Sequence, residues 1–227
     1  MRKVIAILLL AVVGYYILGT LLNLPFGQKA TGVGKYYLDS TIKETGTVNT
    51  VTSIVVSYRG FDTLGEVTVL FLAATGLGAI LFDKKGKKRS LQNASLIVKT
   101  SSKMIYPLTV LLGAYVFVHG HLTPGGGFQG GAIIATGTLL MFMAYRSFET
   151  NHTALTIIES LAGLTFVSIG ISGLIWGYSF LQNILPLGTP NELLSGGIIP
   201  LIYIAVGFKV GAELTTVLDT LLKTIKG

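Results

Sequence analysis

The chain of 227 residues contains no cysteine and few charged side chains. Without cysteine it can form no disulfide, no thiolate zinc site and no iron–sulfur cluster. Charged residues make up 12% of the sequence, where a soluble domain carries about 25%. Hydrophobic residues make up 51%, and the mean hydropathy is +0.70. The composition therefore predicts an integral membrane protein, and any redox chemistry must belong to partner subunits.

The basic residues orient the predicted helices rather than indicate a nucleic-acid site. Most of the 17 lie near the two termini, within residues 83–103 and at Arg146, at the ends of apolar runs. The positive-inside rule places these segments in the cytoplasm, so both termini are expected there. We interpret the basic run 84–89 as stop-transfer charge rather than as a lipid or nucleic-acid patch.

The apolar runs predict an all-α membrane protein with about six transmembrane helices. These runs lie at residues 4–22, 61–82, 104–118, 131–145, 154–176 and 197–218. The third and fourth contain only about 15 residues, where about 20 are needed to cross a bilayer. The first run exceeds the ~7–15 apolar residues of a signal peptide and lacks a small-residue cleavage site, so we expect it to be retained.

A glycine-rich segment separates the two short runs. From His121 it reads HLTPGGGFQGG, and its proline and glycines exclude a continuous helix. Irregular backbone at membrane depth requires hydrogen bonds from surrounding protein or from water in a cavity. We therefore expect an intramembrane loop that dips below the membrane surface, is partly non-helical and is buried by other subunits. The residues expected to pack there are His119, His121, Pro124, Gly125, Gly126, Gly127, Phe128, Gly130 and Gly131.

The two histidines of this segment form a weak metal motif. His-x-His without further ligands is weak evidence for a metal site, so hydrogen bonding of both rings to the loop backbone is the favoured interpretation. The glycines also lack the strand and the Lys-Ser/Thr pair of a phosphate-binding loop. We predict no metal site, no cofactor and no catalytic chemistry in this chain.

The apolar runs divide the chain into three sections that differ in the number of spans and in the length of their connections. Residues 1–82 contain two spans joined by a long polar stretch, which predicts a structured outer loop or an amphipathic segment. Residues 83–103 form a basic linker, and residues 104–227 contain four spans with short connections.

Two acidic residues begin the second span. Asp62 and Glu66 are four residues apart and share a helical face, and Arg59 precedes Asp62 by one turn. Asp62 either complements the helix N-terminus or belongs to an ion path. Glu66 lies more than a turn into the span, which favours a polar path.

Three more ionisable residues lie deeper. Lys209 and Glu213 are four residues apart near the middle and inner part of the last span, so an internal ion pair is expected. The pair either only neutralises its own charges or acts as a proton relay. Glu159 in the fifth span has no partner on its own helix, so it must be protonated or find a partner on another helix.

Two segments resemble known subunits. Residues 120–131 resemble the hallmark of the MrpB/MnhB subunits of Mrp-type multi-subunit Na+/H+ antiporters. The family usually has Asn at or beside Thr123 and an aliphatic residue at Gln129. Residues 58–66, YRGFDTLGE, resemble the C-terminal membrane section of MrpA, a separate small subunit in archaeal membrane-bound hydrogenases. Together these resemblances cover about residues 50–222.

The resemblance implies a non-catalytic subunit of an antiporter module that transports Na+ and H+ in a prokaryotic cell membrane. The module is either free or attached to a hydrogenase-like redox arm, which would make the whole complex an oxidoreductase. The implied partners are MrpA-, MrpC-, MrpD-, MrpF- and MrpG-like subunits and membrane lipid. Depth in the spans, rather than the resemblance, suggests the ion-path candidates: Asp62, Glu66, Glu159, Lys209 and Glu213.

Two other functions are compatible with the sequence. A purely structural subunit would dock its neighbours through the glycine loop while ions pass elsewhere. A stand-alone transporter is disfavoured, because no inverted repeat supplies a second half for alternating access.

Overall fold

The computed structural model describes residues 2–24, 27, 29–81 and 94–226. The described residues form helices joined by turns and loops, with no strand among them, which confirms the all-α class. Six of these helices are long and apolar enough to cross a membrane. The chain divides into two compact units, Met1–Tyr36 and Tyr37–Gly227.

The first unit contains α1, Arg2–Asn23, and the start of α2, Gly32–Thr45. Helix α1 is apolar around its whole circumference, a pattern typical of membrane spans. Its polar side chains bond within the helix, since the Thr20 hydroxyl donates to the Tyr16 carbonyl at 2.9 Å. The helix expected in residues 4–22 is therefore present.

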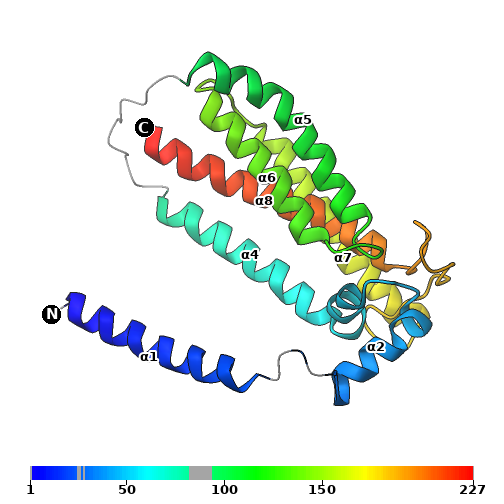
Figure 1. Ribbon diagram of the computed structural model, residues 1–227. Coiled ribbons are helices and arrows are strands. Elements are labelled where there is room, and N and C mark those ends of the chain that lie inside the picture. The colour runs from blue at the N-terminus through cyan, green and yellow to red at the C-terminus, as the bar shows by residue number, and fades with distance from the viewer. Residues whose placement is uncertain (1, 25–26, 28, 82–93, 227) are drawn as a thin grey trace. The chain divides into compact units, whose positions relative to one another are not determined.

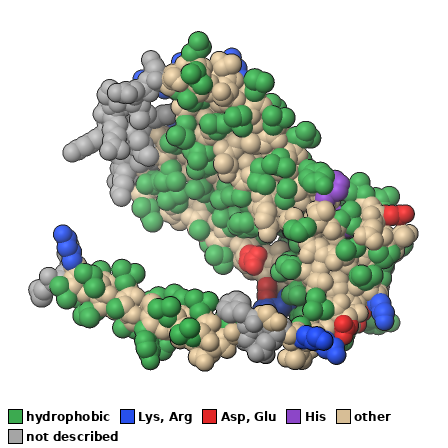
Figure 2. Space-filling model, in the orientation of Figure 1, with side chains coloured by type: hydrophobic (Ala, Val, Ile, Leu, Met, Phe, Trp, Pro, Cys, Tyr) green, Lys and Arg blue, Asp and Glu red, His purple; other side chains and the backbone are tan. Residues whose placement is uncertain are grey.

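Five long helices lie side by side in the second unit (Figure 1). They are α4 Gly60–Leu81, α5 Leu96–Val118, α6 Gly127–Ala144, α7 His152–Trp176 and α8 Ile199–Lys226. Side-chain caps define two of the starts: Ser95 accepts from a backbone N–H of α5, and Asn151 does so for α7. The face of this unit seen in Figure 2 is largely hydrophobic, as a surface against lipid or other subunits must be.

The expected shortness of the third and fourth spans is wrong. Helix α5 has 23 residues, because the Ser95 cap starts it well before Met104 and includes Lys99 and Lys103. Helix α6 has 18 residues and begins at Gly127, inside the glycine-rich segment. Long lysine side chains can reach a polar interface while their stems cover apolar surface, so they do not end a span. The remaining non-helical residues, 119–126, form the connection that we call the glycine loop.

Helix α8 is the central element of the second unit. It has 28 residues and packs against α4, α5, α6 and α7. Ile202, Val206 and Val210 of α8 are buried together with Phe166 of α7 and Val67 of α4. Polar side chains on the inner face of α8 are therefore enclosed by neighbouring helices.

Glycines bring the backbone of α6 against both α5 and α8. A Cβ atom at Gly131 would lie 2.8 Å from the carbonyl oxygen of Gly207 and 2.8 Å from the amide nitrogen of Gly211. A Cβ atom at Gly130 would lie 2.5 Å from the carbonyl oxygen of Gly113. Interfaces between membrane helices are usually enriched in small residues, which let the helix backbones approach closely. This approach explains the two glycines near the start of α6.

The polar stretch between α1 and α4 is structured, as expected. It forms α2, then the single turn α3, Thr50–Thr52, and the π-helix η1, Ser53–Tyr58. Its hydroxyl groups bond to one another: Thr45 Oγ1 lies 2.9 Å from Thr47 Oγ1 and 2.8 Å from Ser53 Oγ. These bonds satisfy buried polar groups that lipid cannot satisfy.

The basic run 84–89 lies outside the described residues. The division of the chain into residues 1–82, a linker at 83–103 and residues 104–227 stays a prediction.

Candidate functional site

Lys209 lies between two carboxylates in the middle of the bundle. Its Nζ is 3.4 Å from Glu159 Oε1 of α7 and 3.5 Å from Glu213 Oε2, one turn further along α8. The side chains of Lys209, Glu159 and Glu213 are 11%, 18% and 1% exposed. The structure thus brings together the expected Lys209–Glu213 pair and supplies the partner that Glu159 needs on another helix. We call these three residues the lysine cluster.

The lysine cluster has more acidic than basic groups. At 3.5 Å, two unit charges attract by about 5 kcal/mol at an effective dielectric constant of about 20. Desolvation costs several kcal/mol for each buried ion, so one lysine compensates one carboxylate but not two. Both Glu213 oxygens are buried and lack a hydrogen-bond partner among the described residues. The cluster becomes neutral when it takes up one proton or one cation.

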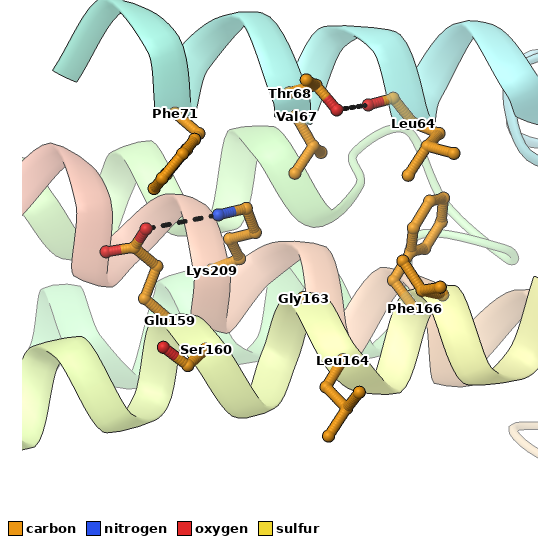
Figure 3. A pocket seen from close by; sticks show the side chains of 11 residues that line it. Leu64, Val67, Thr68, Phe71, Glu159, Ser160, Gly163, Leu164, Phe166 and Lys209 are labelled. Atoms are coloured by element: carbon orange, nitrogen blue, oxygen red, sulfur yellow. Dashed lines mark hydrogen bonds and ion pairs between the residues drawn. The ribbon is translucent and has the colours of Figure 1, made fainter. Parts of the chain in front are cut away.

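An apolar groove of about 310 Å³ opens beside the lysine cluster (Figure 3). Glu159 and Lys209 point toward one another in its wall, and the Lys209 ammonium lies 5.2 Å from the centre of the Phe71 ring. Glu213 does not line the groove. An ion or a polar side chain entering from the α4–α7 side therefore meets Glu159 and Lys209 first. The lining residues are Leu64, Val67, Thr68, Phe71, Glu159, Ser160, Gly163, Leu164, Phe166, Val167 and Lys209.

A second polar cluster lies nearer the C-terminal end of α8. Asp219 is 3% exposed, and its Oδ2 lies 2.8 Å from Lys223 Nζ and 2.5 Å from Nε2 of His152, the first residue of α7. The sequence reasoning missed it, because a span that ends at residue 218 leaves Asp219 outside the membrane. The four-residue spacing of Asp219 and Lys223 is the signal that could have revealed it.

The acidic residues of α4 lie apart from the lysine cluster. Asp62 pairs with Arg59 at 2.5 Å, and both side chains are more than half exposed. Glu66 is exposed and borders a different groove, of about 680 Å³, between α4 and the start of α6. Neither Asp62 nor Glu66 lines the groove at Lys209.

The glycine loop is held by other segments of the same chain. Asn49 Nδ2 donates to the carbonyls of Gly120 and Thr123, each at 2.9 Å. The Thr52 hydroxyl donates to the Gly120 carbonyl at 2.6 Å and accepts from the Tyr203 hydroxyl at 3.1 Å. The expected irregular backbone is therefore present, and residues of this chain supply these bonds. Its burial by other subunits stays a prediction.

The two histidines near the loop differ in their surroundings. His119 Nδ1 donates to the Tyr115 carbonyl at 3.1 Å, one turn back in α5, and its ring stacks on that of Tyr115. His121 is fully buried, and backbone groups of Glu192, Leu193 and Val118 lie close to its ring. The Gly120 carbonyl beside it is already bonded to Asn49 and Thr52. Burial lowers the pKa of His121, which favours a neutral ring.

Comparison with known protein families divides the chain into two matched parts. Residues 97–216 match the model described as a domain related to the MnhB subunit of Na+/H+ antiporter, and residues 1–95 match the MbhE model, which describes the E component of MBH. An uncharacterized protein of Methanocaldococcus jannaschii is 31% identical over 233 residues, which cover 90% of this chain and 87% of that protein.

Two solved structures are also similar. A chain of the membrane-bound sulfane sulfur reductase, an archaeal respiratory membrane complex, is 45% identical with a TM-score of 0.81, covering 97% of this chain and 98% of that chain. A chain of the Mrp complex from Dietzia sp. DQ12-45-1b has the same fold. It is 24% identical with a TM-score of 0.78, covering 97% of this chain and 26% of that longer chain.

Proposed function

Since the chain belongs to the family of membrane domains related to the MnhB subunit of Na+/H+ antiporters, we propose that it is a non-catalytic subunit of a multi-subunit cation/proton antiporter module. Its likeness to a chain of an archaeal respiratory membrane complex supports a module coupled to a redox arm. Other membrane subunits of the Mrp type are its partners, and Na+ and H+ are the transported ions. The chain itself holds no cofactor.

The lysine cluster is the observation that carries this proposal. Buried ionisable groups in membrane helices are costly, and they usually mark ion or proton pathways. Lys209 faces both Glu159 and Glu213, so the cluster takes up and releases one positive charge as ions pass. The adjoining groove gives ions or a partner's polar group access to Glu159 and Lys209.

The acidic residues of α4 form the outer end of the path in this proposal. The distribution of Lys and Arg supports cytoplasmic termini, which puts the start of α4 on the outer side. Glu66, with Asp62 one turn before it, then presents negative charge there and raises the local concentration of cations.

A purely structural role is the alternative. It requires the glycine loop to serve mainly as a docking element for neighbours. The bonds from Asn49 and Thr52 to that loop are internal, so its irregular backbone is supported within the chain. The carbonyls of Gly120 and Thr123 therefore need no neighbouring subunit to satisfy them.

Single neutralisations in the whole complex test the proposal. We expect Glu213→Gln and Lys209→Leu to abolish most cation/proton exchange in membrane vesicles, in the fraction of complex that assembles. Glu149→Gln and Lys103→Gln are matched controls, because both residues are exposed and belong to neither polar cluster. Normal exchange by an assembled Glu213→Gln complex would leave only the structural role.

A further inference from the structure

The polar face of α8 continues past the lysine cluster toward the C-terminal end of the helix. Glu213 is followed by Thr216, by Asp219 and Thr220, and by Lys223, each three or four residues further on. Successive members of this series are neighbours on the helix surface. Glu213 and Asp219 are almost fully buried, whereas Lys223 is exposed. This face therefore leads from the interior of the bundle to one of its ends.

At that end, three titratable side chains meet in a triangle. Asp219 Oδ2 lies 2.5 Å from His152 Nε2 and 2.8 Å from Lys223 Nζ. The third side, from Lys223 Nζ to His152 Nε2, measures 2.6 Å. Thr150 adds a weaker bond to Asp219 Oδ2 at 3.4 Å. Among residues 94–226, the charged or titratable side chains in contact with Asp219 are those of His152 and Lys223.

With Asp219 ionised, no arrangement of protons satisfies all three sides of the triangle. If Lys223 donates to both partners, His152 Nε2 must be an unprotonated acceptor, and its lone pair then faces the carboxylate oxygen. If His152 Nε2 is protonated and donates to Asp219, two donors face one another along the Lys223 side. Adding or removing one proton therefore exchanges one favourable contact of the triangle for another.

The triangle and the lysine cluster lie on the same helix, less than two turns apart. Asp219 is six residues beyond Glu213, about 9 Å along the helix axis. Thr216 lies between them, three residues from each, and its hydroxyl donates to the Ala212 carbonyl at 3.0 Å. Its oxygen remains able to accept a further hydrogen bond. In the other direction, the side chains of His152 and Lys223 are 48% and 52% exposed.

We propose that Asp219, His152 and Lys223 form a proton port, which takes up protons at the C-terminal end of α8 and passes them to Glu213. The step moves only a proton: His152 gains one from the aqueous phase and loses it to Asp219, which delivers it toward Glu213 through the Thr216 region. This inference rests on the proposed transport role of the lysine cluster. Under the assigned orientation, the port faces the cytoplasm.

A merely structural cluster is the competing explanation. Asp219 lies against the first residue of α7, where a carboxylate is favoured by the helix dipole. Such a cluster would tie α7 to α8 without moving protons. Its loss would weaken assembly, and no diffusible base would restore exchange.

The decisive experiment is chemical rescue of His152→Ala in the whole complex. We expect the assembled variant to lose most of its initial rate of sodium-isotope uptake driven by a pH gradient. Imidazole added equally on both sides of the vesicles should restore much of that rate. Wild type and Glu149→Gln serve as controls, since Glu149 is an exposed residue between α6 and α7. They show how far imidazole itself changes the pH gradient.

Parallel variants separate this inference from the proposed function. Loss of exchange in Glu213→Gln with normal exchange in His152→Ala would overturn the port while leaving the lysine cluster in the path. Normal exchange in assembled Glu213→Gln would overturn the transport role of the cluster and, with it, the port. Failure of imidazole to rescue an assembled but inactive His152→Ala complex would favour the structural cluster. Should His152→Ala fail to assemble, the better-matched His152→Gln is the second variant, and failure of both would also overturn the port.

Discussion

Helix α8 has two faces of different chemistry, one lined by glycine and one lined by charged side chains. Toward α6, Gly207 and Gly211 lie against Gly131, and backbone meets backbone. Toward α7, Lys209 and Glu213 lie with Glu159 and form a charged seam. The first seam gains stability from close packing, whereas the second loses stability by burying charge. If α8 only stabilised the bundle, the glycine contact with α6 would be sufficient and the buried charges would be unnecessary.

This contrast assigns different roles to the two seams, the glycine seam between α6 and α8 and the charged seam formed by the lysine cluster. The position of Gly131 tolerates no added atom, because a Cβ atom there would meet backbone atoms of Gly207 and Gly211 that cannot move apart locally. A charged seam tolerates balanced changes, because an ion pair can be exchanged for uncharged residues that fill the same space. Stability should therefore respond to the size of residues in one seam and to the charge balance of residues in the other.

Removing only the cation of the charged seam should have the largest effect on stability. Lys209→Leu leaves Glu159 and Glu213 facing one another without a partner, a change that costs about 3–5 kcal/mol when a buried pair is broken. The triple variant Lys209→Leu/Glu159→Gln/Glu213→Gln should recover most of this loss. Thermal unfolding of the purified complexes measures both. Equal destabilisation by the two variants would show that charge balance does not govern this seam.

Adding one methyl group to the glycine seam should have the next largest effect. Gly131→Ala places a Cβ 2.8 Å from backbone atoms of Gly207 and Gly211, and overpacking of this kind costs about 1–3 kcal/mol. Gly78→Ala in α4 is the matched control, since no atom lies within 4 Å of the added Cβ. The thermal unfolding temperature should fall for the first variant and stay level or rise for the second.

The pH dependence of stability tests the third buried polar region, at the glycine loop. Burial lowers the pKa of His121 in the folded state, so the unfolded chain binds a proton more readily. Stability is then fully present above the unfolded pKa of about 6.5 and is lost as pH falls through the folded value. His121→Leu should remove part of the loss of thermal stability between pH 7 and pH 5. An unchanged slope would show that His121 does not titrate on unfolding.

The exposed ion pair at the start of α4 should matter least for stability. Arg59 and Asp62 are more than half exposed, and such pairs contribute about 0.2–1 kcal/mol. Arg59→Gln/Asp62→Asn should therefore hardly change thermal unfolding, in contrast to Lys209→Leu. A loss as large as that of Lys209→Leu would mean that burial is not what distinguishes the two pairs.

Sequence patterns were sufficient to predict the number of spans and part of the lysine cluster. Apolar runs locate six helices because lipid demands continuous apolar surface. The four-residue spacing of Lys209 and Glu213 gives their pairing, and the lack of a local partner for Glu159 predicts a contact with another helix. Such arguments depend only on helix geometry and on the cost of buried charge.

Other features depend on tertiary packing that no local pattern reveals. Helix α6 begins at Gly127, although glycine is a poor helix former, because α5 and α8 pack closely against its glycines. Asp219 is buried in contact with the first residue of α7. Nor does the sequence indicate that Asn49, far away in the chain, supplies bonds to the glycine loop.

Exchange by the double variant Lys209→Leu/Glu213→Gln, measured in vesicles containing the assembled complex, tests the central claim most directly. It removes both charges of the α8 pair and leaves Glu159 without its partner, a group that is 18% exposed and so costs less to leave unpaired than Glu213, which is 1% exposed. We expect the complex to assemble and to lose cation/proton exchange, about as severely as either single variant, because the lysine cluster can no longer take up and release a positive charge. Normal exchange would show that the charged seam is structural and that ions cross the membrane elsewhere.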